Sequence, residues 1–294
     1  MDEIFATIEG GGTKWICALG NQHGTLLEEI SIKTASPEKT LSIVVDNLQK
    51  LAKKHGDFKS IGIGSFGPIE LDPTAKNYGS FLKTPKEGWS HFNMLNTLRK
   101  AFGNSIPIHL DTDVNAAAYA EAILGAGKSI RNLCYVTVGT GIGGGIYMDG
   151  KLLNGRMHPE VGHLMVQESN NEPIAGFSAC PFHTSCIEGK ASGRAMQARW
   201  GNNHENFPEE AWKLEAHYLG QLCTSLTACY SPDLIIFGGG VSKQDNLLPM
   251  IRSEFKQLAN SYWSLPTLDR YIVPTQLNDK AGLLGALLLA TKAP

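Results

Sequence analysis

Two cysteines and a histidine recur at three-residue intervals in the stretch CPFHTSC, as Cys180, His183 and Cys186. Two thiols and an imidazole at this spacing could form a disulfide, a redox pair or a metal site, or they could be a chance cluster. A redox pair more often has only two residues between its cysteines. The residues by themselves leave these alternatives open.

Three glycine-rich turns could bind phosphate, because a backbone without side chains lets N–H groups approach the oxygens closely. They lie at residues 10–13, 139–144 and 237–242. None is a Walker A sequence, and none matches G-x-G-x-x-G in a βαβ unit. Ordinary tight hairpins are the alternative, since such turns also favour glycine. Three turns together favour binding of a nucleoside triphosphate.

One carboxylate, Asp113, stands between a predicted strand and an alanine-rich predicted helix in the stretch HLDTDVNAAAYAEAILGAG. Open α/β sheets build their sites at the carboxyl ends of strands. The alternative role is a helix N-cap, worth about 1 kcal/mol. Beside phosphate-binding turns, we expect Asp113 to accept a proton from a hydroxyl group.

Elements that would position these residues are predicted from hydrophobic periodicity. Strands are expected at 4–8, 15–19, 26–32, 61–64, 106–110, 133–138, 145–148, 234–237 and 271–273. Helices are expected at 37–54, 92–102, 114–125, 189–200, 209–230, 247–258 and 281–292, the first with Ser36 as its N-cap. This alternation predicts an α/β protein. The unit FATIEGGGTKWICAL returns as YVTVGTGIGGGIYM about 127 residues later, which indicates two related domains.

Composition narrows the class of protein. The 294 residues suffice for two domains, and a net charge of -2 gives no basic surface for nucleic acid or membranes. The start MDEIFATIEG has no basic n-region, and the apolar run 281–290 is far short of the ~20 residues of a membrane span. Six cysteines, mostly in apolar segments, favour a reducing, cytoplasmic setting.

A series of motifs in this order resembles the ROK sugar kinases, and within them the bacterial fructokinase branch. The motifs are EGGGTKW, GSFGP at 64–68, DTDVNAAA at 111–118, VTVGTGIGGGI at 136–146, HPEVGH at 158–163, CPFHTSCIEG at 180–189 and FGGGVS at 237–242. The resemblance implies a two-lobed actin/hexokinase-like (ribonuclease H-like) α/β fold with sugar and ATP in the cleft. It implies lobes at 1–118, joined by the C-terminal helix 280–294, and at 119–279, with a zinc-binding segment at 158–189. Homodimers or homotetramers are usual in the family.

The resemblance also implies an answer for the cysteine cluster, which matches a structural zinc site with His163, Cys180, His183 and Cys186 as ligands. Two thiolates and two imidazoles suit tetrahedral Zn²⁺ and leave no open position for a catalytic water. Many family members have a third cysteine where this chain has His183. The site would fix Glu160 and Glu188, which resemble the acceptors of sugar hydroxyls, and His163 is also placed on the substrate side.

The activity implied by the resemblance is ATP-dependent phosphorylation of D-fructose at the 6-hydroxyl, with Asp113 as the base. Mg²⁺ would bridge the phosphates, and Glu9 stands near the position of the family's usual aspartate. The nucleotide would contact Gly11, Gly12, Thr13 and Lys14 in the first turn, Thr140 and Gly141 in the second, and Gly239, Gly240 and Val241 at the adenosine. Asn115, Gly67 and Pro68 are expected on the sugar side.

Some positions depart from the family or stay unassigned. Arg194 replaces a common proline, which puts nearby nucleotide contacts in question. The segment KEGW at 86–89 is a further candidate for the sugar side, and Lys33 and Lys86 are expected to be solvated charges. Glucose, mannose or an N-acetylated amino sugar are alternative substrates. A non-catalytic sugar-sensing protein is a further alternative. The related repressors carry a DNA-binding region before the first glycine turn, and we expect none here because that turn begins at Gly10.

Overall fold

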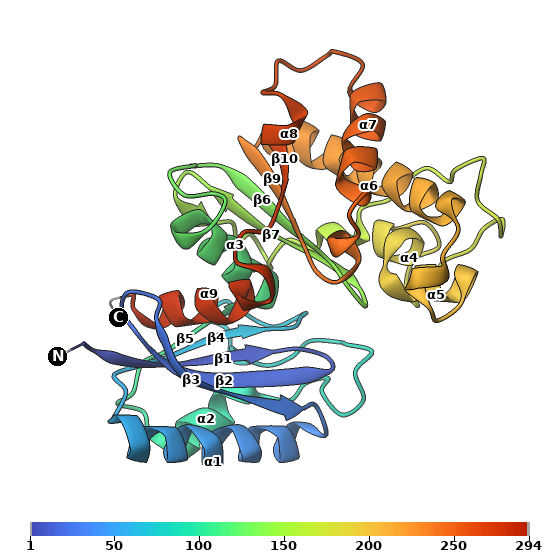
Figure 1. Ribbon diagram of the computed structural model, residues 1–294. Coiled ribbons are helices and arrows are strands. Elements are labelled where there is room, and N and C mark those ends of the chain that lie inside the picture. The colour runs from blue at the N-terminus through green and yellow to red at the C-terminus, as the bar shows by residue number, and fades with distance from the viewer. Residues whose placement is uncertain (1, 293–294) are drawn as a thin grey trace. The chain divides into compact units, whose positions relative to one another are not determined.

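The computed structural model describes residues 2–292, which divide into two compact units (Figure 1). Of the described residues, unit 1 contains 2–120, the short segment Leu153–His158 and 280–292. Unit 2 contains Glu121–Leu152 and Pro159–Asp279. The segment Leu153–His158 therefore packs with unit 1, whereas the sequence placed it in the larger lobe.

Unit 1 is built on a five-stranded mixed sheet in the order β3-β2-β1-β4-β5. Its strands are β1 (Ile4–Gly10), β2 (Lys14–Asn21), β3 (Leu26–Lys33), β4 (Ile61–Ser65) and β5 (Ile108–Thr112). The first three form an antiparallel meander, and β4 and β5 run parallel to β1. Helices α1 (Pro37–His55) and α2 (Met94–Phe102) cover one face, and α9 (Ala281–Ala290) covers the other (Figure 1).

Helix α1 follows directly from its sequence. The Ser36 side chain accepts a hydrogen bond from the Lys39 N–H at 3.4 Å, and Pro37 occupies the first turn. Buried residues lie along one side of the helix, at Thr40, Leu41, Val44, Leu48 and Leu51. The predicted helix and its predicted N-cap are both confirmed.

Helix α9 lies so close to the sheet that two glycines are required. An ideal Cβ on Gly62 of β4 would lie 1.8 Å from the Ala286 carbonyl oxygen. One on Gly285 would lie equally close to the carbonyl oxygen of Ala116 in helix α3 (Asp113–Leu124). The backbone of α9 therefore packs directly on the backbone of β4 and of α3.

Unit 2 repeats the sheet of unit 1. Its order is β10-β9-β6-β7-β8, with an antiparallel β6–β7 hairpin and with β9 and β10 parallel to β6. The strands are β6 (Leu133–Val138), β7 (Ile142–Met148), β8 (Lys151–Leu152), β9 (Leu234–Gly238) and β10 (Ile272–Pro274). The same topology in both units agrees with the internal similarity of the sequence.

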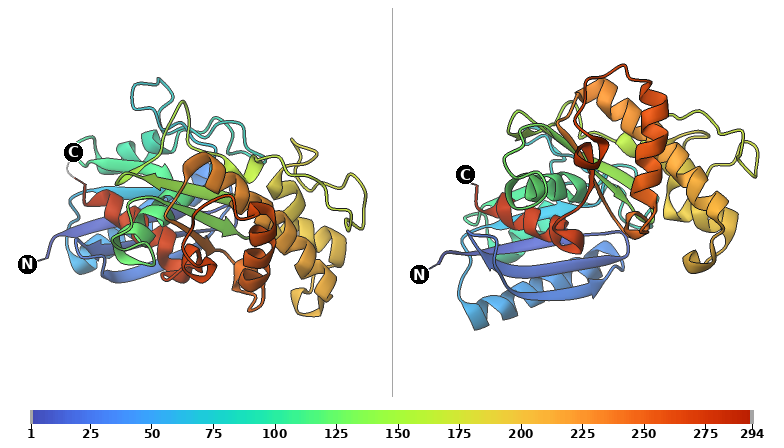
Figure 2. Two further views of the ribbon diagram at one scale, coloured as in Figure 1. Left: turned by 90° about the horizontal axis from the view of Figure 1, so that it is seen from above. Right: turned by 45° about the horizontal axis from the view of Figure 1, so that its top comes forward.

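The helices of unit 2 surround this sheet. They are α4 (Ile187–Ala191), α5 (Gly193–Trp200), α6 (Glu209–Tyr230), α7 (Leu247–Ala259) and α8 (Leu268–Tyr271). Helices α6 and α7 pack side by side (Figure 2) and share an apolar core with β6 and β9. Short 3-10 turns are η1 (Val161–His163), η2 (His204–Asn206), η3 (Val241–Lys243) and η4 (Asn278–Lys280).

Two predicted elements were wrong in detail. The helix expected at 189–200 is two helices, because Ser192 adopts an extended conformation and its hydroxyl caps α5 through the Ala195 N–H at 3.2 Å. The second glycine turn is shorter than expected, because Gly143 and Gly144 pair with β6 inside strand β7. The turn itself is therefore only residues 139–141.

None of the helices in residues 2–292 is both long enough and apolar enough to cross a membrane.

Candidate active site

The first glycine turn joins β1 to β2 in unit 1 and is held by its own backbone and by Thr34. The Gly11 N–H donates to the Lys14 carbonyl oxygen at 2.9 Å, and the Thr34 hydroxyl donates to the Gly11 carbonyl oxygen at 2.9 Å. The Thr34 N–H donates to the Thr13 carbonyl oxygen at 3.0 Å. The space beside Gly12 is open, since no atom lies within 4 Å of an ideal Cβ there. This rigid turn can admit phosphate oxygens next to its backbone.

The SFGP turn lies next to the first glycine turn. The Phe66 N–H donates to the Gly10 carbonyl oxygen at 2.7 Å, and the Leu82 N–H donates to the Pro68 carbonyl oxygen at 2.8 Å. The peptide bond between Gly67 and Pro68 is cis. The structure therefore places two of the predicted sugar-side residues at the end of β4, beside the first glycine turn.

Asp113 is the first residue of α3, but a neighbour caps the helix. The Thr112 hydroxyl accepts the Asn115 N–H at 3.1 Å, which is the bond that an N-cap makes. The Asp113 carboxylate accepts a hydrogen bond from the adjacent Val114 N–H at 2.9 Å. Burial raises the pKa of Asp113 to about 6, because a desolvated carboxylate is less stable. The capping role therefore belongs to Thr112, and Asp113 has the pKa of a general base near neutral pH.

Asn115 is completely buried and is directed toward Asp111. Its side-chain N–H donates to Asp111 Oδ1 at 2.7 Å, while its Oδ1 atom has no hydrogen-bond partner within residues 2–292. An ideal Cβ on Gly64 would lie 3.5 Å from the Asp113 Cα atom. The hydrogen bond from Asn115 to Asp111 thus ties the first turn of α3 to the end of β5.

Glu9, near the end of β1, points toward α9. An ideal Cβ on Gly282 would lie 2.5 Å from Glu9 Oε1. The Glu9 carboxylate therefore lies against the start of α9. In the sequence, Glu9 directly precedes the first glycine turn.

In unit 2, the second and third glycine turns meet at the start of α5. The Gly193 N–H donates to the Gly139 carbonyl oxygen at 2.8 Å, and an ideal Cβ on Gly193 would lie 3.4 Å from Val241. Gly239 has φ of 87°, and a Cβ there would lie 2.4 Å from the Val138 carbonyl oxygen. The second and third glycine turns, which are distant in sequence, therefore lie side by side at the start of α5. Arg194, exposed at the start of α5, lies beside these turns.

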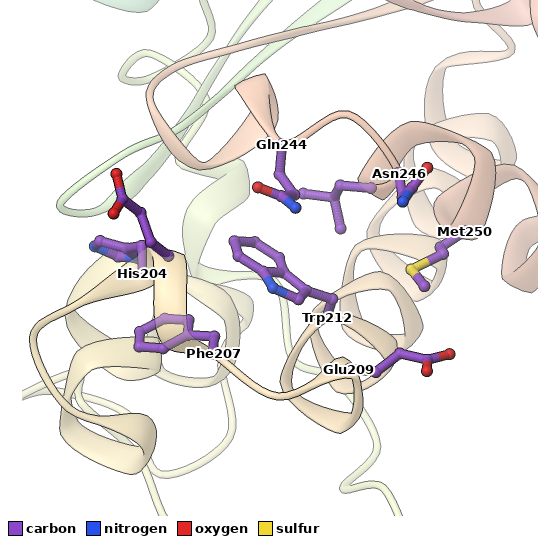
Figure 3. A pocket seen from close by; sticks show the side chains of 9 residues that line it. His204, Phe207, Glu209, Trp212, Gln244, Asn246 and Met250 are labelled. Carbon is purple, nitrogen blue, oxygen red and sulfur yellow. The ribbon is translucent and has the colours of Figure 1, made fainter.

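A cavity of about 260 Å³ is lined in part by residues that follow the third glycine turn in the chain (Figure 3). Gln244 and Asn246, which follow η3, lie on one side, and Trp212 lies between them and Phe207 and His204. The ring centroids of Phe207 and Trp212 are 5.9 Å apart. Aromatic faces with a few amide groups suit a flat heterocycle such as a nucleobase. No periodic pattern in the sequence marks this cavity, because its residues come from two separate segments, 204–212 and 244–250.

The four predicted metal ligands come together in unit 2. One donor atom from each of His163, Cys180, His183 and Cys186 lies within 4.8 Å of all the others. The Cys180 sulfur lies 3.5 Å from His183 Nδ1 and 4.0 Å from His163 Nδ1. Two sulfurs and two ring nitrogens converging at such distances fit a tetrahedral Zn²⁺. Burial raises the pKa of the Cys186 thiol to about 11, so a bound cation would be needed to hold it as thiolate.

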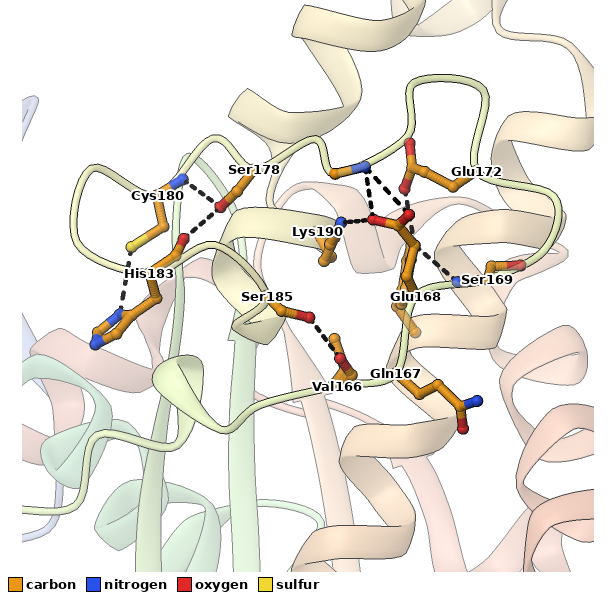
Figure 4. A network of polar contacts seen from close by, with 12 residues as sticks. Val166, Gln167, Glu168, Ser169, Glu172, Ser178, Cys180, His183, Ser185 and Lys190 are labelled. Atoms are coloured by element: carbon orange, nitrogen blue, oxygen red, sulfur yellow. Dashed lines mark hydrogen bonds and ion pairs between the residues drawn. The ribbon is translucent and has the colours of Figure 1, made fainter.

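An ionic network, buried except at Glu168, holds the loop that carries these ligands (Figure 4). The Lys190 ammonium lies 2.5 Å from Glu168 Oε2, and the Arg199 guanidinium pairs with both oxygens of Glu172 at 2.7 and 2.8 Å. Arg199 Nη1 also donates to the Lys190 carbonyl oxygen at 2.6 Å. The Tyr218 hydroxyl donates to Glu172 at 2.7 Å. Sequence reasoning missed this network, because its charges were indistinguishable from solvated ones.

The two predicted sugar acceptors lie on either side of the metal ligands in the chain. Glu188 is in α4, two residues after Cys186, and its Oε2 atom accepts the Ile142 N–H at 3.1 Å. Glu160 is exposed and directly precedes η1, three residues before His163. The segment expected to bind zinc therefore carries both carboxylates.

Comparison with known proteins places the chain in a family. The model of the ROK family matches residues 5–293, so the chain belongs to the ROK family. A fructokinase of Pediococcus pentosaceus is 40% identical over 292 residues, covering 99% of this chain and 98% of that protein. A fructokinase of Zymomonas mobilis is also 40% identical and covers 99% and 97%.

Solved structures agree on the fold. A ROK hexokinase from Thermus thermophilus superposes with a TM-score of 0.80 at 25% identity, covering 98% of this chain and 97% of that one. The predicted α/β, actin/hexokinase-like fold is confirmed. The chain is an ATP-dependent sugar kinase of the ROK family.

Proposed function

We propose that the protein transfers the γ-phosphoryl group of ATP to the 6-hydroxyl of D-fructose, giving fructose 6-phosphate and ADP. The observation that carries the chemistry is Asp113, a carboxylate of raised pKa that α3 does not need for capping. Full-length relatives at 40% identity that are named fructokinase favour fructose as the acceptor.

In the transfer, the sugar oxygen forms a bond to the γ-phosphorus while the bond to the bridging β,γ-oxygen breaks. Asp113 accepts the proton of the hydroxyl as it attacks. The transition state is loose, so positioning and charge neutralisation supply most of the rate enhancement. Glu160, Glu188, His163 and Asn115, with the Gly67–Pro68 turn, are proposed to bind the sugar, because charged acceptors orient hydroxyl groups strongly.

The nucleotide is proposed to lie along the glycine turns. Gly11, Gly12, Thr13 and Lys14 of the first turn, with Thr140 and Gly141 of the second, would contact phosphates, and Gly239, Gly240 and Val241 the adenosine. The aromatic cavity that follows Val241 supports this placement of the nucleotide, because it offers a site for the adenine ring. Mg²⁺, when bound, neutralises charge on the β- and γ-phosphates, and Glu9 is the acid proposed to reach it through water.

Zinc is proposed as a structural ion on His163, Cys180, His183 and Cys186. The support is the convergence of four suitable donors. Four protein ligands would complete the tetrahedron, so the ion would fix Glu160 and Glu188 rather than activate water.

The experiment that tests the function is release of ADP from MgATP with fructose, glucose, mannose, N-acetylglucosamine and N-acetylmannosamine. We expect strong turnover with fructose and much weaker turnover with the other sugars. A preference for another sugar would keep the phosphoryl transfer but change the substrate. No turnover with any sugar would contradict the proposal.

A further inference from the structure

Lys86 lies at the first glycine turn, whereas the sequence suggested a solvated charge in a segment, KEGW, that could lie on the sugar side. Its ammonium group donates a hydrogen bond to the carbonyl oxygen of Gly12, at the centre of that turn. The side chain is half-buried, unlike that of its neighbour Lys83, which is exposed. A positive charge is therefore held beside the backbone proposed to bind phosphate.

A pair of tryptophans fixes this arrangement. Trp89, three residues after Lys86, is fully buried and stacks on Trp15, with ring centroids 5.2 Å apart and planes at 23°. Its ring N–H donates to the Ala35 carbonyl oxygen at 3.1 Å. Trp15 directly follows the first glycine turn, and a Cβ on Gly10 would lie 2.9 Å from its ring. The stack of the two tryptophans thus holds the segment that carries Lys86 against the first glycine turn.

The backbone around Lys86 is closed by local hydrogen bonds. The Thr84 N–H donates to Ser90 Oγ at 3.1 Å, and the Ser90 hydroxyl donates back to the Thr84 carbonyl oxygen at 3.1 Å. The Trp89 N–H donates to the Lys86 carbonyl oxygen at 3.2 Å. A tight loop of this kind limits where the lysine side chain can reach.

The charge of Lys86 is not neutralised by another side chain. Among residues 2–292, no carboxylate forms an ion pair with it, and the Gly12 carbonyl oxygen uses one of its three N–H groups. The space beside Gly12 is open. Phosphoryl transfer needs a cation where negative charge gathers on the transferring group, and a lysine can supply it as a point charge.

We propose that Lys86 is a catalytic residue that contacts the γ-phosphoryl group of ATP and stabilises its charge in the transition state. This proposal rests on the proposed function. Lys86 stays protonated throughout, since the proton of the sugar hydroxyl goes to Asp113.

Three substitutions of Lys86 distinguish a catalytic role from a purely structural one, in which Lys86 only ties its own loop to the first glycine turn. Lys86→Met removes the charge and the donor, Lys86→Gln keeps a donor without charge, and Lys86→Arg keeps the charge. We expect kcat to fall on the order of 10²-fold in the Met and Gln variants, and much less in the Arg variant. The KM for fructose should change less than about threefold, because Lys86 does not bind the sugar.

Affinity for nucleotides supplies a second readout. In the Met variant, calorimetry should show a larger loss of affinity for MgATP than for MgADP, because only ATP carries the γ-phosphoryl group. Lys83→Met, in the same loop but exposed, is the matched control and should behave like the wild type.

Retained kcat in Lys86→Gln would overturn the proposal and show that the contact with Gly12 is only a structural link. A lower melting temperature and a raised KM for fructose with unchanged kcat in Lys86→Met would overturn it as well. Failure of the proposed function is distinguishable, because the wild type itself would then not phosphorylate any sugar in the panel.

Discussion

The Glu188 carboxylate accepts a hydrogen bond from the backbone N–H of Ile142 at 3.1 Å. Ile142 is the first residue of β7 and follows the second glycine turn, whereas Glu188 belongs to a helix capped by Cys186. A Cβ on Gly141 would lie 2.5 Å from Glu188 Oε2, so a larger residue there would displace the carboxylate. One carboxylate thus connects the segment of the proposed zinc ligands to a turn proposed to bind ATP.

Replacing Glu188 should therefore impair both substrates. We expect Glu188→Ala to raise the KM for fructose on the order of 10–100-fold, since a charged hydrogen bond is worth about 1.5–3 kcal/mol. The KM for MgATP should also rise, because the Ile142 N–H loses its acceptor. Steady-state kinetics with each substrate varied measures both effects. Glu38→Gln, an exposed carboxylate on α1, is the control, and an unchanged KM for fructose would remove Glu188 from the sugar site.

Asp113→Asn should abolish catalysis while sugar binding persists. The amide has nearly the same shape but cannot accept the proton, so kcat should fall by about 10²–10⁴-fold. Calorimetric titration with fructose should give a dissociation constant close to that of the wild type. Turnover at the wild-type rate would show that another group is the base.

The activity should depend on pH through Asp113. Its raised pKa of about 6 means that the base is increasingly protonated below that pH. The value of kcat/KM should therefore be about tenfold lower at pH 5 than on the plateau, once circular dichroism shows that the protein is still folded.

Stability supplies the matching check on the same residue. Because the pKa is raised in the folded state, the contribution of Asp113 to stability is greatest below the ordinary value of 3.8 and is lost as pH rises through 6. Asp113→Asn should therefore be more stable than the wild type at pH 8, with the gain shrinking in acid. An equal melting temperature for the two proteins at pH 8 would argue against a raised pKa.

Removal of zinc should disorder the sugar side of unit 2. Elemental analysis of the purified protein should find one zinc per chain. Cys186→Ser should lose the zinc, while the serine hydroxyl can still accept a hydrogen bond at the N-cap of α4. The KM for fructose should rise in that variant. Cys229→Ser, at the exposed cysteine of α6, is the matched control and should keep its zinc. Wild-type protein without zinc would contradict the metal site.

The ion pair between Arg199 and Glu172 should be important for stability. Both side chains are almost completely buried, at 1% and 2% exposure, so Arg199→Met leaves an uncompensated carboxylate. We expect a loss of about 3–5 kcal/mol in the free energy of unfolding, measured by urea titration. Lys213→Met breaks an exposed pair with Glu209 and should cost less than about 1 kcal/mol. Equal losses in the two variants would rule out a special role for the buried network.

Secondary structure was largely predictable where local rules act. Ser36 and Pro37 define the start of α1, and hydrophobic periodicity marked most strands, because capping and amphipathic spacing depend only on near neighbours. Local rules did not reveal that Ser192 ends one helix and begins another. Its extended conformation accompanies the contact of Gly193 with Gly139, a residue far away in the sequence.

The sequence by itself determined the family, the α/β architecture and the residue types at the site, because motifs such as DTDVNAAA and HPEVGH carry their chemistry in consecutive positions. Only the tertiary structure decided what those side chains contact. It directed Asn115 to Asp111, Glu188 to Ile142 and Lys86 to Gly12. Such partners depend on packing between segments: the stack of Trp89 on Trp15 places Lys86, and no local pattern around Lys86 encodes that contact.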